Sequence, residues 1–523
     1  MATEHVWIAG SWREASATST FVAEDPSAGR ALPGDYPQSS WADCDAALTA
    51  AVEAAHVLRS VSGEEIARFL EAYASAIEAR AAEIVAVTYA ETGLPIKPRL
   101  LDVELPRTTT QLRQAAAAAR EGSWQHAVID TKNNIRSHYA PIGPVIVFGP
   151  NNFPFAFNGV SGGDFAAAIA AACPVIAKAH PLHPGTSKLL AQCASDALQG
   201  GALPPATVQM LYSVANEDGL RLVSDSRVGA ACFTGSRAGG LRLKAAADAA
   251  GKVMYLEMSS LNPVVLLPGL IAERGEAVAT ELADSCLAAS GQFCTSPNLI
   301  LAIASEATEQ LAAMLAATLE KRPAAPLLSQ GGLLGLEAGV RWLVQAGAEV
   351  VTGAARADGD GWRYKNTLLR ISGKGFLTKH EELQREAFGN ASLLITTDDA
   401  AELVQVLESL EGNLTGSIYS SSTAEDDAVY AAVAEALRFR VGRLLNNKMP
   451  TGVALSPAMN HGGPFPSTSH PGFTAVGIPR SMLRFGALHC YDNVREDRLP
   501  LALRDRAPHA EMWRAVDGKW IRG

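Results

Sequence analysis

The sequence of 523 residues is longer than one hydrophobic core usually supports, so its length predicts more than one domain. Hydrophobic residues make up 48% of it and charged residues 19%, which excludes a disordered or fibrous chain. Acidic residues outnumber basic ones by 54 to 44, and no stretch concentrates lysine and arginine, so we expect no nucleic-acid partner.

Three helices are predicted ahead of any regular α/β pattern, at residues 41–57, 63–92 and about 104–120. Residues 134–142 then alternate bulky apolar and polar side chains as a strand does, and residues 482–491 do the same near the other end. We predict that these two strands pair as an antiparallel arm. Because an exposed ribbon of this kind tends to aggregate unless another subunit covers it, the arm favours a homodimer or homotetramer.

Residues 142–256 alternate short apolar runs with longer Ala-rich amphipathic segments. This pattern predicts a parallel, doubly wound sheet with crossover helices, whose ligands bind beyond the carboxyl ends of the strands. A further helix is predicted at 273–290, and a second alternation up to about residue 445 predicts a second α/β domain. The first set of apolar runs is Val145–Phe148, Val175–Ala177, Val208–Tyr212, Ala230–Phe233 and Val253–Leu256.

Several residues at these strand ends are suited to binding an anionic or polar ligand. Gly235 and Ser236 stand where a run gives way to a helix, so free backbone N–H groups and the helix dipole face a phosphate there, although an ordinary strand-to-helix turn explains them equally well. Lys178 closes another run and either reaches a ribose or phosphate or is a solvated surface lysine. The amide of Asn152 either donates to an oxyanion or belongs to a turn.

Covalent chemistry is most plausible at one of the seven cysteines. They lie far apart, with no Cys-x-x-Cys pair and no Cys/His cluster at zinc-ligand spacing, so we expect free thiols in a reducing compartment. Cys294 stands at an irregular turn that a substrate can reach, whereas Cys286 lies inside a predicted helix and should pack. Glu257 ends a buried run, as a general base or as a cap for the next turn.

A membrane contact is not expected. No apolar run approaches the roughly 20 residues that span a bilayer, and the first residues lack a basic segment followed by an apolar one. We therefore predict a cytoplasmic protein.

Six short motifs, taken together, resemble the aldehyde dehydrogenase superfamily in their order and spacing over nearly the whole chain. They are Pro-Asn-Asn-Phe-Pro at 150–154, Lys178, Phe-Thr-Gly-Ser at 233–236, Leu-Glu-Met-Ser-Ser at 256–260, Gly-Gln-Phe-Cys at 291–294 and Glu-Ala-Phe-Gly at 386–389. The resemblance implies an α/β fold in four parts. These are a Rossmann-type cofactor-binding domain (1–130 and 145–257), an α/β catalytic domain (258–476), a small antiparallel oligomerisation arm (131–144 and 477–495) and a C-terminal tail (496–523).

The resemblance also implies that the protein oxidises a small-molecule aldehyde to a carboxylic acid with NADP or NAD and without a metal. Cys294 would form a covalent thioester, and Glu257 would activate the water that releases the acid. Asn152 and the Cys294 backbone N–H would form an oxyanion hole. The cofactor would be held by Pro150, Lys178, Gly235, Ser236, Glu386 and Phe388. The substrate would be contacted by Arg107, Phe155 and Gln292.

A closer resemblance, to the α-ketoglutaric semialdehyde (2,5-dioxopentanoate) dehydrogenases, is carried by residues 152–157, 162–164, 178–186, 448–453 and 461–464. Two stretches depart from it: 483–488 lacks an expected second basic residue, and Pro297-Asn298 differs after the nucleophile. An anionic semialdehyde needs a cation in its tunnel, and Arg107 is the hypothesis for that cation.

The choice of cofactor depends on one substitution. Pro181 stands where NAD-specific relatives often place a Glu that binds the ribose hydroxyls, which favours NADP+ with NAD+ also accepted. Against this, residues 216–218 (Asn-Glu-Asp) carry no arginine for a 2′-phosphate.

Four other interpretations are open. A broad-specificity fatty or aromatic aldehyde dehydrogenase would share every motif. A CoA-acylating dehydrogenase would share the nucleophile but commonly lacks the base at the Glu257 position. A thiol esterase would need neither Lys178 nor Glu386. A non-catalytic role is disfavoured because Cys294, Glu257 and Asn152 are all present.

Overall fold

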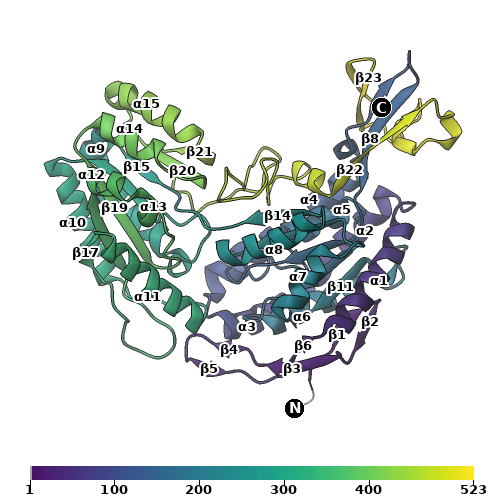
Figure 1. Cartoon of the computed structure of the whole chain (residues 1–523), viewed down its shortest axis with the longest axis horizontal. Helices are drawn as coiled ribbons and strands as arrows, with labels where there is room; N and C mark the ends of the chain where they lie inside the picture. The colour runs from purple at the N-terminus through teal and green to yellow at the C-terminus, as the bar shows by residue number, and fades with distance from the viewer. Residues whose placement is uncertain (1–2) are drawn as a thin grey trace.

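The structure is a computed structural model that describes residues 3–523. It has two α/β lobes side by side and a β-sheet arm that projects from one of them (Figure 1). The first lobe contains a seven-stranded sheet in the order β14-β13-β9-β10-β11-β1-β2. The predicted runs form its five parallel strands, so the doubly wound sheet is confirmed. The strands are β1 (Val6–Ile8), β2 (Ser11–Arg13), β9 (Val145–Phe148), β10 (Val175–Lys178), β11 (Val208–Leu211), β13 (Ala230–Thr234) and β14 (Val253–Glu257).

Eight helices cover this sheet. The segment predicted as one helix at 63–92 is two, because the chain leaves helical geometry at Arg80. The guanidinium of Arg80 bonds Glu83 and, on another helix, Gln192, so a tertiary contact accompanies the bend where no Gly or Pro marks it. The helices are α1 (Trp41–Leu58), α2 (Gly63–Ala79), α3 (Ala81–Thr92), α4 (Leu105–Glu121), α5 (Gly163–Ala170), α6 (Pro184–Leu198), α7 (Asn216–Ser224) and α8 (Arg237–Ala249).

The second lobe confirms the second α/β series. Its seven-stranded sheet has the order β17-β18-β19-β16-β15-β20-β21, parallel except for β17. The strands are β15 (Val264–Leu266), β16 (Leu299–Ile303), β17 (Glu349–Thr352), β18 (Thr367–Ser372), β19 (Ala391–Thr397), β20 (Asn413–Tyr419) and β21 (Val441–Asn446). The helices are α9 (Pro268–Leu287), α10 (Glu306–Lys321), α11 (Gln330–Gln345), α12 (Gly373–Thr378), α13 (His380–Leu383), α14 (Ala400–Glu408) and α15 (Asp427–Arg438).

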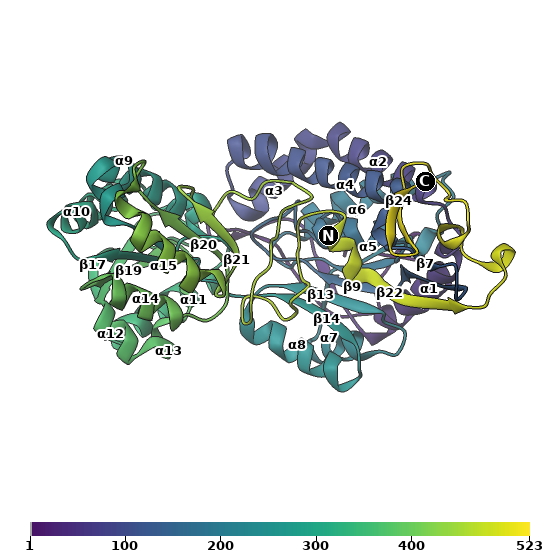
Figure 2. The same ribbon diagram turned by 90° about the horizontal axis from the view of Figure 1, so that it is seen from above.

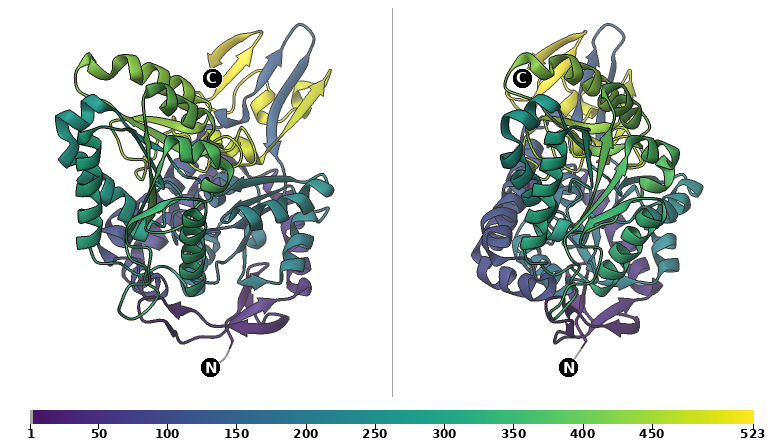
Figure 3. Two further views of the ribbon diagram at one scale, coloured as in Figure 1. Left: turned by 60° about the vertical axis from the view of Figure 1, so that its left-hand side comes forward. Right: turned by 90° about the vertical axis from the view of Figure 1, so that its left-hand side faces the viewer.

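The arm is a five-stranded sheet in the order β22-β8-β7-β23-β24 that projects from the first lobe (Figure 3). The predicted pairing is confirmed, since β8 (Ile135–Pro141) and β22 (Gly486–Asp492) are antiparallel. The final residues do not form a separate tail: β23 (Trp513–Val516) pairs with β7 (Val128–Asp130), and β24 (Lys519–Arg522) completes the sheet. The predicted strand 482–491 begins late, because residues 480–485 form a 3-10 helix.

Two small sheets complete the first lobe, formed by β3 (Ala17–Phe21), β6 (Tyr36–Ser39) and β12 (Ser213–Val214), and by β4 (Glu24–Asp25) and β5 (Arg30–Ala31). The loose region after β21 crosses between the lobes on its way to the arm (Figure 2). It lies against the end of β14, where the Met258 N–H donates to the Ser467 carbonyl. Within residues 3–523, no helix has the length and apolarity needed to cross a bilayer.

Candidate active site

A cavity of about 330 Å³ opens at the carboxyl ends of the first sheet, where it meets the second lobe. The topology brings residues from β9, β13 and β14 to this edge, as the sequence predicted. The size is ordinary for a small-molecule site. Its lining includes eight predicted site residues: Pro150, Asn152, Gly235, Ser236, Glu257, Cys294, Glu386 and Phe388.

Cys294 lies on a tight turn after α9. The chain enters the turn through three consecutive left-handed residues, Ala289, Ser290 and Gly291, with φ of 48°, 57° and 68°. Two of them are not glycine, and such backbone persists only where the surroundings hold it. The side-chain amide of Asn262 donates to the Cys294 carbonyl at 2.9 Å and so fixes the turn. Cys294 is half-buried at the cavity wall, whereas Cys286 is buried in α9, as predicted.

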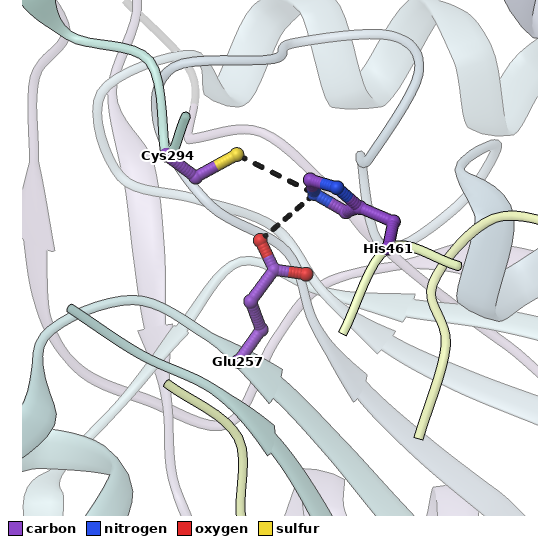
Figure 4. Close-up of side chains that lie close together, drawn as sticks. All are labelled: Glu257, Cys294 and His461. Atoms are coloured by element: carbon purple, nitrogen blue, oxygen red, sulfur yellow. Dashed lines mark hydrogen bonds and ion pairs between the residues drawn. The ribbon is translucent and has the colours of Figure 1, made fainter. Parts of the chain in front are cut away.

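Three reactive side chains meet beside this turn: Cys294, Glu257 from the end of β14 and His461 from the interlobe loop (Figure 4). The His461 Nε2 lies 3.5 Å from the Cys294 Sγ and 3.2 Å from a Glu257 carboxylate oxygen. The three atoms lie within 4.8 Å of one another, close enough to share one metal ion. Burial, and next the charge of Glu257, raise the pKa of the Cys294 thiol well above its usual value. The thiol therefore needs a proton acceptor in contact.

Asn152 faces the same turn from the end of β9. Its amide nitrogen donates one hydrogen to the Gln292 carbonyl at 2.8 Å, and an amide has a second hydrogen to offer. Two charged residues hold the segment 152–156 in place. Glu104 accepts the backbone N–H groups of Phe155 and Ala156, and Arg99 bonds both Glu104 and the Asn152 carbonyl.

The far end of the cavity has groups suited to a dinucleotide. Ser236 lines the cavity and caps α8, accepting the Gly239 N–H at 3.3 Å, so the N-terminus of this helix lies at the cavity. The Glu386 carboxylate accepts the Ser260 N–H at 3.5 Å and interacts with the Ser259 side chain, and burial raises the pKa of its carboxyl to about 7. Such a carboxylate has lone pairs left for ribose hydroxyls. Lys178, on β10, lies outside the cavity lining, and burial lowers the pKa of its ammonium to about 8.

Two predicted substrate contacts lie elsewhere. Phe155 is 1% exposed and belongs to the hydrophobic core of the first lobe. The side chain of Gln292 is buried and bonds the Ala289 carbonyl and the Leu328 N–H, so it ties the turn together. Neither lines the cavity, because local packing already uses both side chains.

Arg107 lies on α4 with its guanidinium turned inward. One Nη donates to the Val453 carbonyl, while Nε and the other Nη are buried without a hydrogen-bond partner. Arg443 on β21 is similar: it donates to the carbonyls of Gly452 and Pro450, and its Nε has no partner. Within residues 3–523, neither guanidinium has a carboxylate within 4.0 Å. Arg107 interacts electrostatically with Glu104 and Cys294, and Arg443 with Cys294 and Arg107.

Comparison with known proteins identifies the family. The family model described as "Aldehyde dehydrogenase family" matches residues 12–468. The chain belongs to the aldehyde dehydrogenase family. It is 37% identical to "Alpha-ketoglutaric semialdehyde dehydrogenase 2" of Azospirillum brasilense over 98% of both chains. It is 35% identical to "Alpha-ketoglutaric semialdehyde dehydrogenase" of Acinetobacter baylyi over 92% of both chains. The structure of PnpE with nicotinamide adenine dinucleotide superposes with a TM-score of 0.81, 19% identity and coverage of 94% of this chain and 99% of that one.

The protein is accordingly an NAD(P)-dependent oxidoreductase that converts aldehydes to carboxylic acids. The cavity brings together eight of the residues that the sequence predicted. The structure adds two residues near Cys294: His461, which the sequence placed only in a family-like stretch, and Arg443, which no motif includes. Each belongs to a segment more than 140 residues from Cys294, so no local pattern connects it with the nucleophile.

Proposed function

We propose that this aldehyde dehydrogenase oxidises an anionic semialdehyde, such as 2,5-dioxopentanoate, to the corresponding dicarboxylate. The observation that carries the proposal is the pair of inward-facing arginines near the nucleophile. Arg107 and Arg443 keep buried N–H donors without partners. A buried guanidinium without a counter-ion is costly, and a substrate carboxylate would satisfy it with charge-assisted hydrogen bonds.

Both arginines keep their charge at neutral pH. Burial lowers the pKa of both guanidiniums, and the charge of Arg107 lowers that of Arg443 further, yet both remain protonated at neutral pH because the pKa of arginine starts so high. Two positive charges near Cys294 favour a substrate whose carboxylate lies remote from its aldehyde. The names of the two relatives, which are α-ketoglutaric semialdehyde dehydrogenases, support the same substrate class.

Acylation uses the Cys294 thiol and the Asn152 amide. The Cys294 thiolate attacks the aldehyde carbon, and the electrons of the carbonyl bond move to oxygen. The remaining N–H of the Asn152 amide and the Cys294 backbone N–H stabilise that oxyanion. Bound NAD(P)+ supplies the acceptor for the hydride, whose departure from the adduct leaves a thioester on Cys294.

Deacylation uses the carboxylate at the end of β14. Glu257 takes a proton from water, and the resulting hydroxide attacks the thioester carbon. Collapse expels the Cys294 thiolate and releases the acid. The presence of Glu257 favours water over coenzyme A as the acyl acceptor.

Cofactor binding is proposed at the predicted residues. The start of α8, with Gly235 and Ser236, would hold the pyrophosphate. Glu386 would bind the nicotinamide ribose, and Pro150 and Phe388 would pack on the ring side of the cavity. Lys178 would reach the adenosine ribose.

We propose NADP+ as the preferred cofactor, with NAD+ also used. The charges near the Lys178 ammonium support this preference: His180 and His183 interact with Lys178, and no carboxylate contributes to its pKa shift. Together with Pro181, these groups present no negative charge to a 2′-phosphate.

A substrate panel tests the proposal. Formation of NADPH and NADH is followed by absorbance with acidic semialdehydes, neutral aliphatic aldehydes and aromatic aldehydes, and Cys294→Ala serves as the blank. We expect the highest kcat/KM for semialdehydes with a remote carboxylate. Equal values for neutral aldehydes of the same length would contradict the anionic substrate, and a kcat/KM at least tenfold higher with NAD+ would contradict the cofactor preference.

The arm is proposed to join subunits of a homo-oligomer. Leu488 on the edge strand β22 is 65% exposed, and Trp520 on β24 is 59% exposed. An open edge with exposed apolar side chains is an aggregation hazard that a second copy would cover. Light scattering after size exclusion should give a dimer or tetramer, and Leu488→Asp should shift it towards the monomer.

A further inference from the structure

His461 lies in an irregular loop but is held by hydrogen bonds and by packing. Its backbone N–H donates to the Thr474 hydroxyl at 2.9 Å, and its carbonyl accepts the Ala475 N–H at 2.8 Å. The imidazole is 2% exposed and packs against Phe157, with ring centroids 5.6 Å apart. The following Gly462 is required, because a Cβ there would meet the Phe473 carbonyl oxygen at 2.2 Å.

One nitrogen of this ring faces both groups that must exchange protons. Nε2 is 3.5 Å from the Cys294 Sγ and 3.2 Å from the Glu257 carboxylate, while the buried Nδ1 has no hydrogen-bond partner (Figure 4). Nε2 can therefore accept a proton from the thiol or donate one to the carboxylate, according to its own state.

The charges around the thiol explain why it needs such a partner. The carboxylates that face it are Glu257 and Glu386, and both oppose formation of a thiolate. The positive groups that interact with Cys294, Arg107 and Arg443, act through their charge, without a hydrogen bond to Sγ. The imidazole of His461 is in hydrogen-bond contact with Sγ. Glu257 also interacts with the thiol, but its charge opposes the thiolate, whereas an imidazole that has accepted the thiol proton is a cation beside it.

We propose that His461 is a catalytic residue, the base that removes the proton from the Cys294 thiol, so that Glu257 is reserved for activating water. The proposal rests on Cys294 as the nucleophile of the proposed function. The S–H bond breaks, its electron pair stays on sulfur, and the proton goes to Nε2. The imidazolium then stands between thiolate and carboxylate and is neutralised by both.

The proton balance closes over one turnover. Glu257 gains a proton from water, and the imidazolium returns its own proton to the thiolate when the thioester is cleaved. The proton on Glu257 and that of the product acid leave to solvent. Two half-reactions thus use two different bases, and removal of either should arrest the cycle at a different point.

Alkylation of the cofactor-free enzyme by iodoacetamide tests the first base directly. EDTA is present to remove any ion bound by the three-residue cluster. Mass spectrometry locates the label, Cys294→Ala gives the background, and His489→Gln on the exposed face of the arm is the matched control. We expect His461→Gln and His461→Asn to slow labelling of Cys294 about tenfold or more at pH 7. The difference should shrink as the pH rises, because hydroxide then replaces the imidazole as the base.

An activated ester gives a second readout without the cofactor. p-Nitrophenyl acetate should acylate Cys294 and release nitrophenol in a burst. We expect His461→Gln to lose burst rate, and Glu257→Gln to keep the burst but lose the steady state.

The outcomes separate the two proposals. Wild-type labelling rates in both His461 variants, with the wild-type melting temperature, would overturn the role of His461. A normal burst with a lost steady state in these variants would also overturn it, because His461 would then act in deacylation. If Cys294→Ala still oxidised aldehydes, the proposed function itself would fail.

Discussion

Arg107→Met should separate acidic from neutral substrates. Methionine keeps most of the apolar stem and removes the buried N–H donors that have no partner in the protein. A hydrogen bond to a charged group contributes about 1.5–3 kcal/mol, so kcat/KM for an acidic semialdehyde should fall about tenfold to a hundredfold, mainly through KM. A neutral aldehyde of the same length has no carboxylate to lose and should be affected less than about threefold.

The measurement is steady-state kinetics with both substrates, and Arg113→Met is the matched control. Arg113 lies on the same helix, but its guanidinium pairs with Glu78 on the exposed face. Arg107 also donates to the Val453 carbonyl, so the melting temperature must be measured beside the kinetics. Arg443→Met should show the same selectivity. Equal losses for the acidic and neutral aldehydes in both variants would refute the reasoning, since they would show a structural role only.

Three further predictions concern the carboxylates. Glu257→Gln should accumulate the Cys294 thioester, seen in the intact mass as an added acyl group, and an unmodified mass during turnover would count against the deacylating role. Burial raises the pKa of Glu386 to about 7 in the folded state, so its contribution to stability is full below about pH 4.5 and declines as the pH rises towards 7. Glu386→Gln should therefore leave the melting temperature of the cofactor-free protein unchanged near pH 4.5. At pH 8 the variant should melt at a higher temperature than the wild type, with an unfolding free energy larger by up to about 3 kcal/mol. The same effect of the substitution at both pH values would contradict this prediction. Glu104→Gln leaves the buried guanidinium of Arg99 uncompensated, so urea titration should show a loss of about 3–5 kcal/mol, and retention of full stability would argue against the ion pair.

Much of the fold was predictable because it repeats simple periods. Five apolar runs separated by helical segments define a parallel sheet, and the structure has those strands within a residue of the predicted bounds. The errors occur where contact between distant segments overrides the local pattern. The break at Arg80 and the addition of the final hairpin to the arm both depend on partners far away in the chain.

The site also has residues that the local pattern places and residues that only distant contacts place. Asn152, Gly235 and Glu257 stand at strand ends, so topology alone brings them to one edge, and family motifs added Cys294 and Glu386. Phe155 lies in the family-like stretch 152–157 and Gln292 in the motif 291–294, yet packing uses the first side chain and the turn uses the second. A motif specifies a position along the chain but not where its side chain points.

The sequence by itself determined the two α/β series and the pairing of the arm strands, because both follow from short-range periodicity. It also determined the order of the motifs around Cys294, through their resemblance to a family. Only the tertiary structure decided which groups lie close to the nucleophile. His461 reaches Cys294 across 167 residues, and Arg443 approaches from the edge of the second sheet. Proton transfer and charge compensation require contact or proximity in space, which becomes visible only when the lobes and the loop between them are packed.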